Sequence, residues 1–98
     1  MRFEWDDRKN ESNLKKHGVD FVLASRVFDD PYCVTEIDRI EDGELRLRTV
    51  GEIDGEYLLL VIHLLDTDGE EFEEAVRIIS ARKAERQERR RYERGFQT

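Results

Sequence analysis

The spacing of apolar residues along this chain changes twice, and each change marks a change of predicted secondary structure. Near the N-terminus apolar residues recur every three or four positions, as in helices, and through the middle they alternate with polar residues, as in strands. Near the C-terminus a run of Ala, Arg, Lys, Glu and Gln again favours a helix. The predicted order is an extended segment, two helices, four strands and a final helix, at about residues 1–5, 7–17, 21–29, 32–38, 44–53, 57–65, 74–79 and 81–94.

This order predicts an α+β fold with an antiparallel β-sheet, two N-terminal helices and one C-terminal helix. The segment Tyr57–Leu65 is apolar on both of its faces, so we expect it to be a central strand that is covered from both sides. In the second helix, Phe21 and Ala24 begin a buried stripe. The first helix is far more polar, and Leu14 is its predicted anchor.

The join between the last strand and the final helix carries an unusual set of charges. Ser80 is predicted to cap the helix, with Arg82 and Lys83 in its first turn. Cations there destabilise an isolated helix, because the helix dipole is positive at its N-terminus. Two cations beside free backbone N–H groups suit an incoming phosphate, so the sequence predicts an anion site at this join.

Length and charge indicate a single domain, residues 1–98, with two regions of opposite sign. Ninety-eight residues are enough for one modest core. The net charge is −7, but residues 77–98 hold eight basic and three acidic side chains, a balance of +5, which leaves −12 for residues 1–76. An acidic body with a basic final helix indicates a polyanion site at one end and a basic partner elsewhere. The alternative is that the two regions neutralise each other within one molecule.

The cysteine, the N-terminus and the histidines bear on the cellular setting and on cofactors. Cys33 has no partner for an internal disulfide and fits a reducing compartment. The early charges argue against a signal peptide, and no apolar run approaches membrane-spanning length, so we expect a cytoplasmic protein without membrane contact. His17 and His63 lack metal-ligand spacing, so neither a metal nor another cofactor is expected.

Several short blocks of residues occur along nearly the whole chain in a specific combination. They are Phe3-Glu4-Trp5-Asp6, Lys9-Asn10, Asn13, Lys16-His17-Gly18-Val19, Phe21, Val27-Phe28, Asp30-Pro31, Gly43-Glu44, Arg46, Gly51, residues 77–84, Glu88-Arg89 and Tyr92-Glu93. Together these blocks resemble the BrnT toxin family. The resemblance implies a RelE-like fold and a metal-independent endoribonuclease that cleaves RNA and arrests translation. It also implies a partner, a BrnA-like antitoxin with a ribbon-helix-helix fold. The toxin itself would reach operator DNA only through this antitoxin.

One segment departs from the family pattern. Residues 66–74 are strongly acidic, where the family tends to carry a segment with Thr or Arg. If this turn borders the RNA path, it repels phosphates. An alternative function is therefore a catalytically weak or inactive binding module that acts through its antitoxin as a co-repressor.

The resemblance and the residues together suggest a catalytic set. Metal-independent RNA cleavage needs a proton carrier and several cations. His17, between Lys16 and Gly18 at a helix end, is a candidate general acid or base, and the alternative is a histidine that only satisfies helix-end carbonyls. His63 lies within the apolar central strand, where a neutral core histidine is the favoured interpretation.

The candidate phosphate ligands are arginines and one lysine. Arg46 and Arg48 share a strand face, and Arg77 is expected on a nearby strand, from which guanidinium groups can clamp a phosphate. The alternative is cross-strand pairing with glutamates. Tyr92 is expected to pack the final helix on the sheet, or to donate its hydroxyl. The predicted catalytic residues are His17, Arg46, Arg77, Arg82 and Lys83, and the predicted RNA-binding residues are Lys16, Arg48, Arg86 and Arg90.

Overall fold

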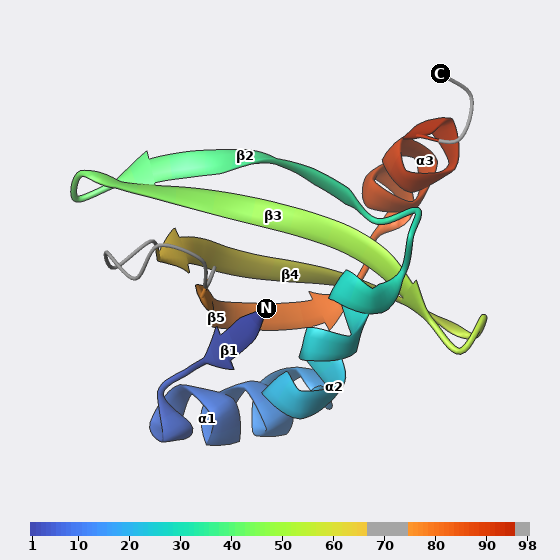
Figure 1. Ribbon diagram of the computed structural model, residues 1–98. Coiled ribbons are helices and arrows are strands. Elements are labelled where there is room, and N and C mark those ends of the chain that lie inside the picture. The colour runs from blue at the N-terminus through green and yellow to red at the C-terminus, as the bar shows by residue number, and fades with distance from the viewer. Residues whose placement is uncertain (67–74, 96–98) are drawn as a thin grey trace.

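The computed structural model describes residues 1–66 and 75–95. Figure 1 shows one sheet with helices on both sides. In chain order the elements are β1 (Arg2–Glu4), α1 (Asp7–His17), α2 (Phe21–Ser25), the 3-10 helix η1 (Arg26–Asp29), β2 (Val34–Glu41), β3 (Glu44–Ile53), β4 (Tyr57–Asp66), β5 (Ala75–Lys83) and α3 (Arg86–Arg94).

The described strands form a single sheet in the order β1-β5-β4-β3-β2. Strands β2 to β5 pair antiparallel with their neighbours, as the sequence predicts. In contrast, β1 lies parallel to β5. A parallel pair requires a long connection, which the helices and the three intervening strands provide. The α+β prediction is therefore confirmed, and the sheet is mixed, with one parallel pair at its edge.

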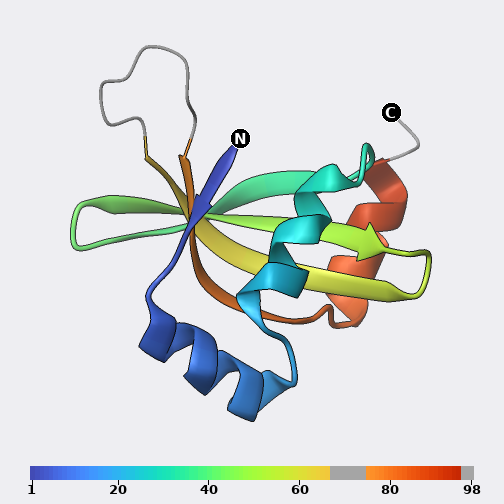
Figure 2. The same ribbon diagram turned by 60° about the horizontal axis from the view of Figure 1, so that its bottom comes forward.

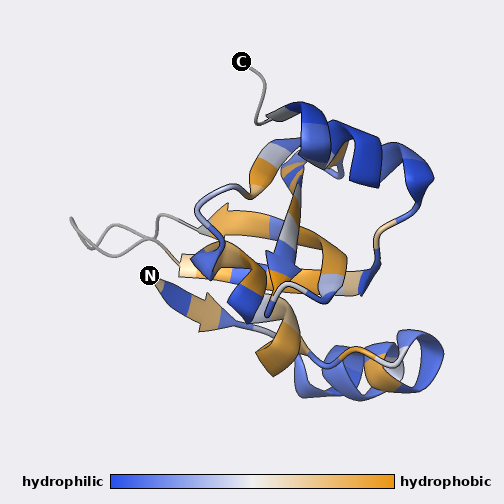
Figure 3. Ribbon diagram, turned by 90° about the vertical axis from the view of Figure 1, so that its right-hand side faces the viewer, coloured by the Kyte–Doolittle hydropathy of each residue, from blue (hydrophilic) through white to orange (hydrophobic). Residues whose placement is uncertain are grey.

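The helices divide between the two faces of the sheet. In Figure 1, α1, α2 and η1 lie on one side and α3 on the other. The first side holds the larger apolar core, in which Phe21, Ala24 and Val27 pack on β4 and β5. Figure 3 shows that α3 is hydrophilic along most of its length. None of the described helices is long and apolar enough to cross a membrane.

The central position of β4 is confirmed. Leu59 and Val61 pack into the core under α2, whereas Leu58 and Leu60 pack on the opposite face with Tyr92 of α3. All four strand side chains are buried. Burial on both faces explains why this strand has no polar alternation.

The nine residues predicted for the second helix are divided between α2 and η1. The close approach of η1 to β3 requires a glycine in the strand. A Cβ placed on Gly51 would lie 2.6 Å from Val27 Cγ1 and 2.9 Å from the Val27 carbonyl oxygen. Contacts that short do not occur in packed interiors, so any side chain at this position would push η1 away from the sheet.

The residue that anchors α1 is Asn13, and the prediction of Leu14 is wrong. Leu14 is 49% exposed, whereas Asn13 is buried. The Asn13 amide donates to the carbonyls of Ala81 (2.7 Å) and Val19 (2.8 Å), and its oxygen accepts from the Ala81 N–H (3.1 Å). Because β1 covers β5 only at residues 75–77, this side chain satisfies backbone groups farther along the same edge.

The predicted start of the final helix is also wrong. Ser80, Arg82 and Lys83 belong to β5 and pair with residues of β4, so Ser80 caps no helix. The helix begins at Arg86 after Glu85, and the Glu88 carboxylate accepts from the Glu85 N–H (2.7 Å) in a capping box. Strand pairing overrides the helical propensity of residues 81–84, because the buried Ala81 is held in the sheet.

Candidate functional site: an arginine-lined groove

Four of the predicted cations lie on one face of the sheet. On β4, Leu60 packs towards α3, and it pairs with Arg82 of β5. Ile62, on the same side of β4, pairs with Arg48 of β3. Strand β4 lies between the two arginine-bearing strands, β3 and β5, and separates them by about 10 Å. The sequence suggested a phosphate clamp from adjacent strands, but these two strands are not adjacent. We call this side the arginine face; it holds the predicted cations Arg46, Arg48, Arg77 and Arg82, and also Arg39 of β2, which pairs with Arg46.

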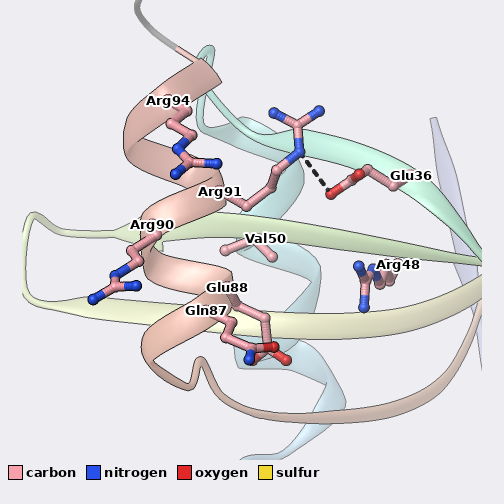
Figure 4. Close-up of a pocket in the computed structure, with 8 residues that line it drawn as sticks. All are labelled: Glu36, Arg48, Val50, Gln87, Glu88, Arg90, Arg91 and Arg94. Atoms are coloured by element: carbon pink, nitrogen blue, oxygen red, sulfur yellow. Dashed lines mark ion pairs between the residues drawn. The ribbon is translucent and has the colours of Figure 1, made fainter.

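A groove of about 300 Å³ lies between α3 and the arginine face (Figure 4). The sheet contributes Arg48, and α3 contributes Arg90, Arg91 and Arg94. Converging guanidinium groups create a positive potential that attracts a polyanion. We call this cavity the arginine groove; its remaining lining residues are Glu36, Val50, Gln87 and Glu88.

At the base of α3, Glu88 holds Arg82. The two side chains form a bidentate pair, with N–O distances of 2.7 and 2.8 Å. The hydrogen bonds from Arg82 lower the pKa of Glu88 although burial opposes this, and they raise the pKa of Arg82. The Glu88 side chain is only 13% exposed. Arg82 is therefore a positioned strand cation and not a free cation in a helical first turn.

Of the arginines that line the groove, Arg91 of α3 has an acidic neighbour, Glu36 of β2 at 3.1 Å, the pair drawn in Figure 4. Arg48, Arg90 and Arg94 form no ion pair within the part of the chain that the structure describes. Arg48 is the one of these three that lies in the sheet wall, so a ligand meets its guanidinium without first displacing a carboxylate.

Arg46 and Arg77 pair with glutamates at the far end of the arginine face. Arg46 lies 3.3 Å from Glu41, and Arg77 lies 3.7 Å from Glu4. The glutamate pairing that the sequence left open for these arginines is therefore present. The Arg46 side chain is 21% exposed and its Nε is buried, whereas Arg77 is 40% exposed. An exposed pair such as Arg77–Glu4 contributes about 0–1 kcal/mol, so a phosphate can compete for Arg77.

Lys83 and Arg86 stand apart from the groove. Lys83 pairs with Leu59, whose side chain packs in the core on the other face, so strand alternation places Lys83 opposite to Arg82. The two cations predicted to share one anion site therefore face different sides. Arg86 begins α3 but does not line the groove, whereas the predicted Arg90 does.

His17 and Lys16 lie at a second, smaller cavity. It has a volume of about 250 Å³ and lies between α1 and the edge of β5, where Ile79 and Ser80 also line it. No residue lines both this cavity and the arginine groove. The structure therefore does not bring the predicted proton carrier together with the predicted phosphate ligands of the groove.

Tyr92 fixes α3 to the body of the protein, both by packing and through its hydroxyl. Its ring is buried, and its hydroxyl donates to Asp30 Oδ2 at 2.7 Å. Asp30 also accepts from the N–H groups of Glu52 (2.8 Å) and Tyr32 (2.9 Å). Burial opposes ionisation of Asp30, but these hydrogen bonds outweigh it and lower its pKa; burial and the bond to Asp30 raise the pKa of Tyr92.

His63 is a neutral core histidine. Its Nε2 lies 2.8 Å from the Thr49 hydroxyl, which lies 2.7 Å from the Thr35 hydroxyl. Burial lowers the pKa of His63 to about 4. The ring packs edge-on against Phe28, on the face away from the arginines. In the described ranges, 1–66 and 75–95, no three His, Cys, Asp or Glu side chains cluster as metal ligands do.

The predicted site residues did not include Glu88, Arg91 and Arg94, which line the groove. The prediction placed the start of the helix at residue 81. The buried residue of α3 is Tyr92, and Glu88 precedes it by one turn, on the sheet side. Taking Tyr92 as the packing anchor would have identified this side. The acidic segment predicted to repel RNA, residues 66–74, falls almost wholly outside the described residues.

Comparisons with known proteins give a family and a solved relative. A family model described as a ribonuclease toxin, BrnT, of a type II toxin–antitoxin system matches residues 5–88. The crystal structure of the Brucella abortus ribonuclease toxin BrnT is similar, with a TM-score of 0.62 and 29% identity. The alignment covers 88% of this chain and 99% of the Brucella chain. A comparison with curated protein sequences gives no match.

Proposed function

Because this chain belongs to the family of BrnT ribonuclease toxins of type II toxin–antitoxin systems, we propose that it is a metal-independent endoribonuclease that cleaves RNA and inhibits translation. Its substrate is cytoplasmic RNA. A ribbon-helix-helix antitoxin neutralises it, and it reaches operator DNA only through that antitoxin. The observation that supports this proposal most directly is the arginine groove, in which Arg48 lies with the arginines of α3. Arg82 lies beside the groove, across β4 from Arg48, and is bonded to the groove residue Glu88.

The groove suits the transition state of RNA cleavage without a metal. The ribose 2′-oxygen attacks the adjacent phosphorus and the 5′-oxygen leaves, which gives a 2′,3′-cyclic phosphate and a 5′-hydroxyl. A base takes the 2′-hydroxyl proton, and an acid returns a proton to the 5′-oxygen. Arg48 and Arg82 stabilise the extra negative charge on the phosphorane. Arg46 and Arg77 extend the cationic path along the same face, and Arg90 extends it along α3.

Glu88 serves in this mechanism as a positioning residue. Both of its oxygens accept hydrogen bonds from Arg82, and its lowered pKa makes it a weak base. Its carboxylate fixes the Arg82 guanidinium in one orientation, so less ordering is needed when RNA binds. Lys83, on the opposite face, is left out of the phosphate-binding set.

His17 is the proposed proton carrier only if the scissile phosphate lies at the edge of β5. A general acid or base has to be within hydrogen-bonding reach of the reacting oxygen. The cavity that holds His17 and Lys16 is separate from the arginine groove. The two cavities are therefore alternative positions for the reacting phosphate, and variants in each distinguish them.

The test is cleavage of RNA by the purified chain in EDTA, between pH 6 and 8. We expect Arg48→Ala and Arg82→Ala each to lower the cleavage rate by about 100-fold, the size typical of losing one transition-state donor. Arg89→Ala is the matched control, since Arg89 lies on α3 but does not line the groove, and it should change the rate less than twofold.

Three results would overturn the assignment. If the folded wild-type chain cleaves no RNA under these conditions, the enzymatic proposal fails. If His17→Gln abolishes cleavage while Arg48→Ala has no effect, the reacting phosphate lies at the β5 edge. Equal losses in Arg48→Ala and Arg89→Ala would indicate general charge attraction in place of a built site.

A second candidate function is a binding module with little catalysis. The observation that favours it is the pairing of cations in or beside the groove with carboxylates, as in Arg91 with Glu36 and Arg82 with Glu88. These partners compete with RNA phosphates. Expression without the antitoxin distinguishes the two functions, because an active toxin arrests growth and Arg82→Ala relieves the arrest, whereas a binding module leaves growth unchanged.

A further inference from the structure

A strip of large aliphatic side chains is exposed on the hairpin formed by β2 and β3. Ile37 and Ile40 of β2 are 66% and 72% exposed, and Leu45 of β3 is 46% exposed. In the register of the two strands Ile40 pairs with Leu45, and Ile37 pairs with the half-buried Leu47. The four side chains therefore form two adjacent cross-strand pairs, which we call the hairpin strip.

The hairpin strip lies on the face of the sheet opposite the arginines. Leu45 and Leu47 alternate along β3 with Arg46 and Arg48, so their side chains point the other way. This is the face that α2 and η1 cover elsewhere. Figures 1 and 2 show that the turn between β2 and β3 projects away from all three labelled α-helices, which leaves this end of the hairpin without a helical cover.

Such a strip identifies a surface that binds another protein. Single exposed aliphatic side chains are common, but adjacent ones on a strand at the edge of a sheet expose a contiguous apolar patch. Strand β2 also lies at the edge of the sheet. Among the described residues, no strand pairs with the backbone groups on its outer side. Apolar area next to an open strand edge is the usual arrangement for docking an amphipathic segment.

The charges around the strip specify the chemistry of the partner. The turn at its end carries Glu41, Asp42 and Glu44, directly beside Ile40 and Leu45. Arg39 and Arg46 pair with Glu41, so Asp42 and Glu44 are the carboxylates of this turn without an ion pair among the described residues. Two copies of this chain would bring these like charges together, which opposes self-association through the strip. A segment with apolar residues on one side and lysines or arginines at the margin is complementary to both features. The family supplies a candidate for this partner, because a type II toxin–antitoxin system includes an antitoxin.

We propose that the hairpin strip is the docking surface for a basic, amphipathic segment of the antitoxin. The inference rests on the toxin function proposed above in one respect: it requires that a neutralising protein exists. Docking there anchors the antitoxin on one face of the sheet while the arginine groove lies on the other. Antitoxin affinity and RNA cleavage are then governed by different residues and are separable by substitution.

The experiment measures binding of the antitoxin encoded with this chain, purified by itself, by isothermal titration calorimetry. We expect Ile37→Thr/Ile40→Thr to weaken binding at least tenfold, because threonine keeps the β-branched shape and removes apolar contact. RNA cleavage should change less than twofold, as neither residue lines the arginine groove. Val22→Thr, at a 60% exposed position of α2, is the matched control and should bind normally.

A second variant tests the charge complementarity. Asp42→Asn/Glu44→Gln should weaken binding severalfold in low salt and reduce the salt dependence of the affinity. Asn is suited to position 42, where the backbone has a positive φ of 51°. Circular dichroism and thermal unfolding establish that each variant is folded before its affinity is interpreted.

The outcomes separate this inference from the enzymatic proposal. Unchanged affinity in Ile37→Thr/Ile40→Thr overturns the docking surface, whatever the cleavage assay gives. A wild-type dimer in sedimentation that this variant abolishes also overturns it, because the strip is then an interface between copies. A chain that cleaves no RNA but loses antitoxin binding in this variant supports the docking surface and removes the proposed activity.

Discussion

One face of the sheet packs against α2 and η1 through apolar side chains and holds α1 through the buried Asn13, whereas α3 reaches the other face with a single buried residue, Tyr92. On the first face the His63 ring is neutral, and its Nε2 lies within hydrogen-bonding distance of Thr49. On the second face arginines and glutamates remain partly exposed. The contrast indicates that stability is concentrated on one face, and the proposed anion site lies on the other.

The difference also determines how firmly each helix is held. Asn13 fixes α1 by buried hydrogen bonds to backbone groups, and Phe21 places α2 directly in the core. Helix α3 relies on the Tyr92 contact to Asp30 and on the Arg82–Glu88 pair. Substitutions on the first face should therefore change unfolding more than equivalent ones near α3.

The largest effect is expected from protonation of His63 in the apolar core. Its pKa of about 4 in the folded chain lies below its ordinary value near 6.5, so the unfolded chain binds the proton more tightly. Stability is then full above about pH 6.5 and falls by about 3 kcal/mol as the pH drops to 4. Urea unfolding of the wild type and of His63→Gln at each pH measures this loss of stability, because the variant has no imidazole to protonate. If the unfolding free energy depends on pH in the same way in both proteins, the interpretation of His63 as a buried neutral histidine is wrong.

A smaller loss is expected from Asn13→Ala at the edge of β5. The change leaves the N–H and carbonyl of Ala81 and the carbonyl of Val19 without their partner, which should cost about 2 kcal/mol of unfolding free energy. The control is the neighbouring Leu14→Ala, at a half-exposed position, where we expect a change under about 0.5 kcal/mol. Chemical denaturation gives both values, and the reverse order would restore Leu14 as the anchor of α1.

The smallest effect is expected on the arginine face, from Tyr92→Phe. The ring still packs on Leu58 and Leu60, and only the hydroxyl bond to Asp30 is lost, so unfolding should become easier by about 1 kcal/mol. Amide exchange in α3 should rise more than in β4, because the bond fixes the helix. A uniform rise throughout the chain would show that α3 does not open separately.

The sequence was a good guide to the elements whose burial is visible in their residue pattern. The apolar run of β4 and the glycine after α1 predicted a central strand and a helix end in the right places. It was a poor guide at residues 80–83, where local helical propensity competes with pairing to β4. That pairing is a long-range contact, and a local pattern contains no information about it.

The candidate site shows the same division. The pattern placed Arg46 and Arg48 on one strand face, and the structure agrees. It also grouped Arg82 with Lys83 and with His17, which the strand alternation and the position of α1 separate. Glu88 was missed because its role depends on Arg82, a partner in another element.

The Asn13 side chain has a consequence for the behaviour of this protein at high concentration. A bare strand edge is a template on which other chains add strands and aggregate. Beyond residue 77, β5 would present such an edge, since β1 has already ended. The Asn13 amide engages both backbone groups of Ala81, much as a neighbouring strand would. One asparagine thus protects this edge from intermolecular β-pairing and helps to keep the protein in solution.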